Sequence, residues 1–531
     1  MTTLAEIKVK METALNAAGY DVAEGKAHLW DVGGCDLVVP AFGNCFGNNP
    51  AAPYIVPIVP HREGEVYDYG ASMQWGRNAQ GDPLYATYRL REDEAILMFG
   101  NMPPEGAYLG YETFLFTRYF DVDNITSPHM DWLNDAIGLQ HQLSPNPDNI
   151  LYNKAPKAVG NKYIKDQDRV LLFANIGPTI NRRVLERKIG NDFWEQQAIF
   201  SISPDANFEA MLNSALQAID PALVGIHAHN ALGADLKMGL TNHDDDFWTL
   251  MRYAVPKVKE EGDAWRKSLA DHLMVFRVSK RAPNVVIRHR RQEFEEKTYT
   301  TDERALATGL QKVANAVSAN LGFGLSPQEV LMTTGNIPLH GPFTIPRAMN
   351  NLGATHDTDT YRLSTARNFG SKEVFAIVGV NHTKTKNASY VSIGVYDSAV
   401  LTGLHGISQG AGFDGPLDGS VEEFFEITGT PENISGIDLS NFYVHILVRP
   451  DSDIPDGLKD TPLCSVIKAM PDKSAKGGAV IPIDTHIRVS QRGYLNPDPA
   501  ASCGADHTRT LSPILLVKGT GTKTDKMKPE I

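Results

Sequence analysis

The second half of the chain consists largely of short apolar segments with the composition of β-strands. They are rich in β-branched and aromatic residues and are separated by turn-forming residues, as expected of strands. Only residues 421–425 show the apolar spacing of a helix in this half. The pattern predicts a strand-rich part built from residues 374–380, 390–396, 442–448, 485–489 and 513–517.

The first half combines strands with amphipathic helices. A helix should follow the strand at residues 198–202, with Ser203 as its N-cap. Partly segregated strands and helices predict an α+β fold with mixed sheets and packed helices. Further strands are expected at residues 95–99, 170–174 and 274–278, and an N-terminal helix is expected from the spacing of Leu4, Ile7, Met11 and Leu15.

The length of 531 residues allows more than one domain. Residues 336–360 have a loop-like composition and are a natural connection. We therefore predict two closely packed parts. The first is an α+β domain with an N-terminal helix at residues 1–335, and the second is a strand-rich α+β domain at residues 336–531.

The charge balance excludes functions that need a basic surface. The chain has 50 Lys and Arg against 63 Asp and Glu, a net charge of −13, whereas nucleic-acid binding needs a positively charged face. No segment approaches the ~18 consecutive apolar residues of a membrane-spanning helix. We expect a soluble acidic protein that binds a small molecule, with no nucleic-acid or membrane partner and with a homo-oligomer as one permitted state.

The four cysteines do not form a disulfide framework in a chain of this length. Cys35 and Cys45 could pair, but free thiols are the favoured interpretation. The N-terminus lacks the apolar core of a signal peptide. Together these features predict a cytoplasmic protein.

A polar connection between two predicted strands carries the main catalytic candidate. Residues 381–389 are almost all polar and form a longer loop than an ordinary hairpin. His382 directly follows a strand, and histidine is the side chain best suited to proton transfer near neutral pH. We predict His382 as a proton carrier, Asp357 or Asp359 as its partner, and Asn381 as a substrate-binding residue.

Two further segments supply candidate substrate-binding residues. A stretch dense in Gly, Asn and Pro, typical of turns, offers Asn48 and Asn49 as polar groups for a ligand. Residues 108–120 are rich in aromatic side chains and fit either a helix or a strand. As a helix, this segment would place Tyr111 and Arg118 on one face.

The run Gly406-Ile407-Ser408-Gln409-Gly410 matches the G-x-S-x-G pattern of a nucleophile elbow. Over residues 406–412 it resembles the elbow of serine esterases of the α/β-hydrolase family. The glycines and the proline at residues 412–419 prevent the regular helix that should follow an elbow, so we predict that Ser408 is not an activated nucleophile. The resemblance implies an acid and a base drawn in chain order from Asp451 or Asp456 and from His486 or His507.

Two histidines and a run of acids have residue types found in metal sites. His227 and His229 are two positions apart, so on a strand they would point to the same side. The acids at residues 244–246 precede apolar residues at helical spacing and are expected to begin a helix, where negative charge is favourable. We therefore predict no metal site, and the sequence identifies no cofactor.

These features predict a soluble enzyme that performs acid–base chemistry, of hydrolase or lyase type, on a small polar or aromatic substrate. A bare binding module rarely needs 531 residues. Two alternatives stay open. One is a serine hydrolase that uses Ser408, and the other is a non-enzymatic binding or assembly protein.

Overall fold

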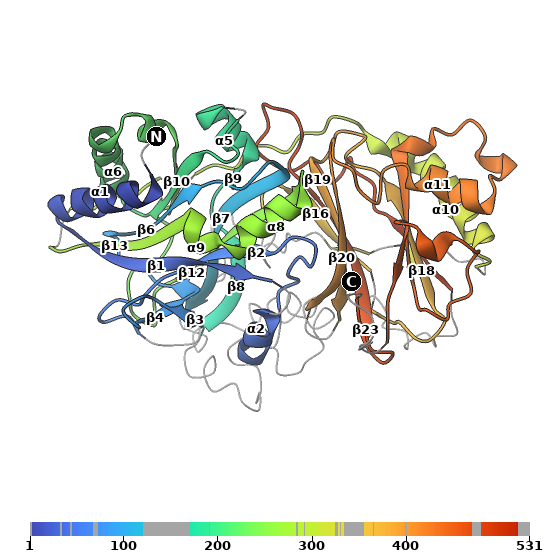
Figure 1. Ribbon diagram of the computed structural model, residues 1–531, viewed down its shortest axis with the longest axis horizontal. Coiled ribbons are helices and arrows are strands. Elements are labelled where there is room, and N and C mark those ends of the chain that lie inside the picture. The colour runs from blue at the N-terminus through green and yellow to red at the C-terminus, as the bar shows by residue number, and fades with distance from the viewer. Residues whose placement is uncertain are drawn as a thin grey trace, which may run out of the picture.

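The computed structural model contains two groups of β-sheets with helices packed on them (Figure 1). It describes residues 3–518 except 32–33, 43–44, 67–72, 120–168, 191, 283–284, 291, 324–327, 330, 334–354, 365, 399–400 and 470–478. The fold is α+β with mixed sheets and a strand-rich C-terminal part, as predicted. The predicted domain boundary at residue 335 lies outside the described residues and stays a prediction.

The first sheet is built from residues before 281. Its strands are β1 (Tyr20–Trp30), β2 (Tyr54–Ile58), β5 (Thr87–Tyr88), β6 (Glu94–Asn101), β7 (Gly106–Tyr119), β8 (Arg169–Asn175), β9 (Ile180–Asn181), β10 (Gln197–Ser203), β11 (His227–Ala231), β12 (Asp246–Pro256) and β13 (Leu273–Lys280). The order is β11-β10-β6-β13-β1-β2-β12-β7-β8, with β5 and β9 paired to β12 and β7. Beside it, β3 (Gln74–Arg77) pairs with β4 (Pro83–Tyr85).

Helices α1 (Leu4–Ala17) and α6 (Ala206–Ile219) pack together on this sheet, at the left of Figure 1. The α1 helix begins with a capping box between Thr3 and Glu6. Asp205 caps α6, so the predicted cap at Ser203 is wrong by two residues. The remaining helices of this part are α2 (Cys35–Phe42), α5 (Arg182–Ile189), α7 (Ala222–Gly225), α8 (Lys259–Lys267) and α9 (Leu269–His272).

Two sheets form the C-terminal part. The five-stranded sheet has the order β14 (Gln328–Glu329), β24 (Ile514–Lys518), β18 (Val374–Val380), β21 (Phe442–Val448) and β22 (Cys464–Val466). The six-stranded sheet has the order β15 (Leu331–Thr333), β16 (Thr358–Leu363), β23 (His486–Tyr494), β19 (Tyr390–Asp397) and β20 (Gly403–Gly410), and β17 (Arg367–Asn368) pairs with β23.

Strand β18 explains why the apolar segments of this part are continuous. Phe375 and Ile377 belong to the core that β18 shares with the six-stranded sheet, whereas Val374, Ala376 and Val378 belong to a core on the other face. Helices α10 (Ala307–Asn320) and α11 (Ser420–Thr428) cover that second face (Figure 1). A strand buried on both faces needs apolar residues at every position.

Three local predictions are wrong. Residues 246–256 form β12 instead of a helix. Residues 381–389 do not close a hairpin, because β18 and β19 belong to different sheets. Cys35 and Cys45 form a disulfide instead of staying free. Among the described residues, no helix is long and apolar enough to cross a membrane.

Candidate functional site at the junction of the sheets

Three neighbouring strands of the first sheet bring polar side chains to the junction with the C-terminal sheets. In the register of these strands, Tyr54 on β2 lies opposite Arg252 on β12, which lies opposite Gly110 on β7. Tyr108 and Glu112 flank Gly110 on the same face of β7, because alternate residues of a strand share a face. All four polar side chains are buried.

The six-stranded sheet supplies the other side of this junction. Tyr494 at the end of β23 pairs with Tyr390 at the start of β19 and with Thr358 at the start of β16. Asp357, which directly precedes β16, is therefore held at the same end of the sheet. The ring of Tyr108 crosses to this side, with centroids 5.8 Å from Tyr390 and 5.3 Å from Tyr494.

One short hydrogen bond connects the two sides, and two more each hold an acid in place, one on each side. The Tyr108 hydroxyl donates to Oδ2 of Asp357 at 2.6 Å, and the Thr355 hydroxyl donates to Oδ1 at 2.6 Å. Thr179 donates to Oε2 of Glu112 at 2.7 Å. We name Tyr54, Tyr108, Glu112, Arg252 and Asp357 the junction cluster.

Arg252 lies between two aromatic rings of the junction. Its Nη2 donates to the Tyr54 hydroxyl at 2.9 Å. Its guanidinium carbon lies 4.7 Å from the centre of the Tyr54 ring and 4.6 Å from the centre of the Tyr494 ring. Cation–π contacts of this kind favour the charged guanidinium in a buried site.

A small cavity lies within the cluster. Gly110 lines it, and its lack of a side chain leaves room for the Tyr108 hydroxyl. A Cβ atom at residue 110 would lie 2.2 Å from the Tyr108 hydroxyl oxygen, so only glycine lets that hydroxyl pass. The cavity is lined by Tyr54, Tyr108, Gly110, Glu112, Phe114, Thr179, Leu250, Arg252 and Thr355.

The electrostatic environment lowers the pKa of Tyr54. Burial alone would raise it, but the positive charges of Arg252 and Arg492, together with the hydrogen bond from Arg252, outweigh burial. The pKa of the Tyr54 hydroxyl is therefore below its usual value of about 10. The negatively charged phenolate is the form that this environment favours.

The same junction raises the pKa values of its acids. Burial, reinforced by the neighbouring Asp357, raises the pKa of Glu112 well above its usual range. Burial also raises the pKa of Asp357, although hydrogen bonds from Thr355 and Tyr108 oppose the shift. Burial and the Asp357 charge raise the pKa of Tyr108. Groups whose pKa values are pushed apart are the usual sign of an acid and a base in one site.

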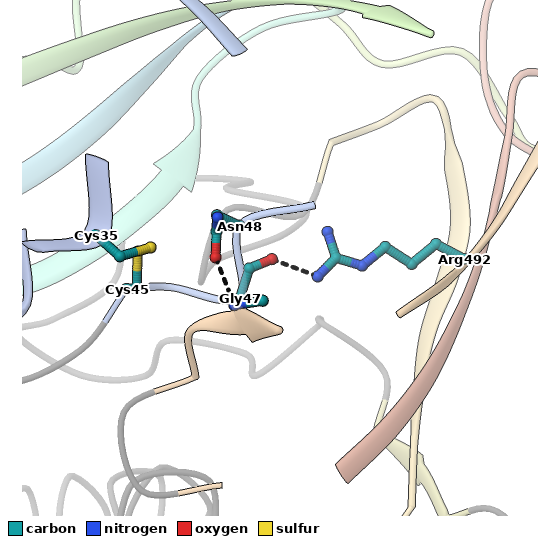
Figure 2. Close-up of a disulfide and its surroundings, with 6 residues drawn as sticks. Cys35, Cys45, Gly47, Asn48 and Arg492 are labelled. Carbon is teal, nitrogen blue, oxygen red and sulfur yellow. Dashed lines mark hydrogen bonds between the residues drawn. A yellow bond between two sulfur atoms is a disulfide. The ribbon is translucent and has the colours of Figure 1, made fainter. Parts of the chain in front are cut away.

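The segment that directly follows a disulfide crosses the junction (Figure 2). The bond joins Cys35, at the start of α2, to Cys45. Two residues further on, the carbonyl of Gly47 accepts a hydrogen bond from Nη2 of Arg492 on β23. This segment is thereby fixed by the disulfide in the first part and by the Arg492 hydrogen bond on the C-terminal part.

The predicted substrate-binding residues Asn48 and Asn49 follow Gly47 in this segment and are buried. Oδ1 of Asn48 accepts from the backbone N–H of Gly403 at 2.8 Å. Nδ2 of Asn49 donates to the Tyr390 hydroxyl at 2.8 Å, and its Oδ1 accepts from Ser392 at 3.0 Å. Both side-chain amides join this segment to the C-terminal sheets.

His382 lies in a second buried polar group. Its Nδ1 lies 2.8 Å from Oε1 of Glu303, and its Nε2 lies 3.3 Å from Nη1 of Arg362. The partner of His382 is therefore Glu303, whereas Asp357 bonds to Tyr108 and Thr355. The side chain of Asp359 is outside the described residues.

The other predicted site residues lie apart from the junction cluster. Tyr111 points to the opposite face of β7 and stacks on Phe200, with ring centroids 4.6 Å apart. Arg118 forms an ion pair with Asp245 at 2.6 Å. Nδ2 of Asn381 donates to Asp418 at 2.8 Å.

The remaining sequence motifs also have local structural explanations. Ser408 lies within β20, so the G-x-S-x-G run is a strand instead of a turn, and its hydroxyl lies 3.5 Å from that of Tyr390. The expected helix start at residues 244–246 is absent, because Asp245 and Asp246 are buried partners of Arg118 and Arg89.

Sequence reasoning missed four of the five residues of the junction cluster, and included only Asp357. Glu112 and Arg252 did leave a signal, because each is a charged residue in the middle of a largely apolar strand, whereas the other charged residue of each strand lies near one of its ends. A buried charge is costly unless it is paired or functional. Tyr54 and Tyr108 left no such signal, because tyrosine is common in ordinary strands.

Comparisons with known proteins do not supply a family. No family model and no curated protein matches the sequence. The fold is weakly similar to an uncharacterized protein from Burkholderia cenocepacia, with 10% identity and a TM-score of 0.34 over 96% of this chain and 87% of that one. It is also weakly similar to the VPA0106 protein from Vibrio parahaemolyticus, with 10% identity and a TM-score of 0.30 over 82% of this chain and 88% of that one. Likeness at this level says nothing about what this chain does.

Proposed function

We propose that the protein is an enzyme that performs acid–base chemistry, of lyase or hydrolase type, on a small polar substrate in the cavity of the junction cluster. The observation that carries this proposal is the opposite direction of two pKa shifts around one cavity. The pKa of Tyr54 is lowered, while the pKa of Glu112 is raised. Both side chains line the cavity.

Each residue of the cluster has a distinct role in this proposal. Tyr54 is the base, because a lowered pKa increases the fraction of phenolate that can remove a proton. Glu112 is the acid, because a raised pKa keeps its carboxyl protonated and able to donate. Asp357 is a positioning residue, since it fixes the Tyr108 hydroxyl.

Arg252 determines the kind of substrate that we propose. Its guanidinium lines the cavity and stabilises negative charge that develops on a substrate oxygen. The cavity is small, at about 10 Å³, which is the room of about one water molecule. We therefore propose a substrate of only a few heavy atoms that carries a carboxylate or an ionisable hydroxyl, and that enters when the side chains lining the cavity move apart.

The disulfide also changes the compartment that we propose. Disulfides persist mainly in oxidising compartments and are rare in the cytosol. The pairing of Cys35 with Cys45 favours an oxidising compartment over the cytoplasm expected from the sequence.

Turnover of a panel of small hydroxy acids, amino acids and esters, followed by proton NMR, tests the proposed function. For any compound turned over, Tyr54→Phe and Glu112→Gln are each expected to lower the rate by ~10²–10⁴-fold, as for loss of a general base or acid. Ser408→Ala is the matched control and should retain the rate. Loss of activity in Ser408→Ala alone would establish the serine hydrolase instead, and turnover of no compound would favour a non-enzymatic binding protein.

A further inference from the structure

Two histidines and a glutamate at the far edge of the first sheet have the geometry of a metal site. His229 lies on β11, Glu209 on α6, and His289 on the segment that follows β13. One ligand atom from each of the three lies within 4.8 Å of the others. Strand β11 ends the sheet order on the side away from β12 and β7, so this group is separate from the junction cluster.

Three elements converge because the segment carrying His289 is fixed along the start of α6. The backbone N–H of His289 donates to Pro204 at 3.0 Å, and that of Ile287 donates to Oδ1 of Asp205, the α6 cap, at 3.1 Å. On its other side, His289 forms a bridge with Gly233, two residues after β11. The position of the His289 ring is therefore set by backbone contacts on both sides.

A chain of hydrogen bonds sets the protonation of His229. Oδ1 of Asn213 lies 2.7 Å from Nδ1 of His227, so that nitrogen carries a proton and Nε2 of the neutral ring accepts. Ser201 donates to this Nε2 at 2.7 Å, and its oxygen accepts from Nδ1 of His229 at 2.6 Å. The lone pair of His229 is thereby left on Nε2, the atom that faces His289.

The distances between the ligand atoms fit one small cation. Nε2 of His229 and Nε2 of His289 are 3.0 Å apart, and two nitrogens at ~2.0–2.1 Å from a tetrahedral ion lie about 3.3 Å apart. Oε2 of Glu209 lies 4.0 Å from Nε2 of His289, with a partly exposed side chain that can move closer. The Nδ1–H of His229 donates to the Ser201 oxygen, and a metal-bound histidine usually donates its other ring N–H to an oxygen in this way.

We propose that His229, His289 and Glu209 bind one divalent transition-metal ion, with zinc as the best fit to two imidazoles and a carboxylate. Three protein ligands leave a fourth position for water. The sequence indicates His227 and His229 as candidates, whereas Glu209 and His289 are identified as ligands only by the structure. His227 then holds Ser201 in place instead of binding the ion.

Titration of the protein with ZnCl₂ after chelator treatment, without a histidine tag, tests this site. Calorimetry should give one zinc ion per chain. His289→Ala and Glu209→Gln, both at partly exposed positions, should each weaken binding at least tenfold, and Ser201→Ala should weaken it by ~10–100-fold. The exposed His486 supplies the matched control, since His486→Ala should leave affinity unchanged.

A cobalt spectrum adds a measurement that would stay unchanged if His289 had only a structural role. Co²⁺ in place of zinc should show the strong visible bands of a tetrahedral site, and His289→Ala should remove them. Absence of stoichiometric zinc binding, or the same affinity in His289→Ala and Glu209→Gln as in the parent protein, would overturn the proposal.

Discussion

Replacing Arg277 by methionine is expected to destabilise the first sheet by about 3–5 kcal/mol, the usual result of removing one member of a buried ion pair. Arg277 on β13 is fully buried and bonds to Glu65 at 2.6 Å and to Glu94 at 3.0 Å. Burial alone would raise the pKa of Glu65, but the charges of Arg277 and His61 and two backbone hydrogen bonds lower it below its usual range. Without Arg277, two buried carboxylates lose their shared cation.

Tryptophan fluorescence during urea unfolding measures this loss, because all six tryptophans precede residue 266 and so report on the first part. The matched control is Arg281→Met. Arg281 pairs with Asp21 at 2.8 Å, but both side chains are about half exposed, and such pairs contribute ~1 kcal/mol or less. Equal midpoints for the two variants would contradict the importance of the buried pair.

Replacing Glu303 by glutamine is expected to destabilise the C-terminal part by about 3 kcal/mol at neutral pH. Oε1 of Glu303 accepts from Thr385 at 2.5 Å and Asn387 at 2.9 Å and lies 2.8 Å from Nδ1 of His382. Burial would raise the pKa of Glu303, but these partners lower it from 4.5 to about 2. A shift of that size corresponds to about 3 kcal/mol.

The effect of Glu303→Gln should depend on pH in one direction. The folded pKa is below the unfolded pKa, so the ionised carboxylate stabilises the fold above about pH 4.5, and this contribution disappears as the pH falls through about 2. Urea midpoints measured by circular dichroism at several pH values should therefore converge for the parent and the variant in acid. Glu426→Gln, at an exposed position on α11, is the matched control. A difference that persists undiminished at pH 2 would contradict this account of Glu303.

The strands that are buried on both faces could be predicted from the sequence, because burial on two faces requires continuous apolar runs. Strand β12 could not be predicted from the sequence. Its apolar residues after Asp246 also fit helical spacing, and the acids before them resemble a helix start. What decides the structure is the pairing of Asp245 with Arg118 and of Asp246 with Arg89, and partners more than a hundred positions away leave no local signal.

The candidate site was less predictable than the fold for the same reason. Asp357 could be selected as a polar residue beside a strand, but its partner Tyr108 is 249 positions away. The polar loop at His382 was predicted to present catalytic groups, because polar loops held by rigid strands often do. In the structure Glu303, 79 positions before His382, is buried against it and also accepts hydrogen bonds from the loop.

The ionisation of Tyr54 tests the central claim most directly. In protein labelled with ¹³C at the tyrosine ζ carbon, one resonance should titrate below about pH 10, the ordinary value for tyrosine. It should disappear in Tyr54→Phe, persist in Tyr494→Phe, and titrate at higher pH in Arg252→Met. If no tyrosine of the folded protein titrates below about pH 10, or if Tyr54→Phe leaves the low-pH resonance in place, the junction cluster does not hold the base that we propose.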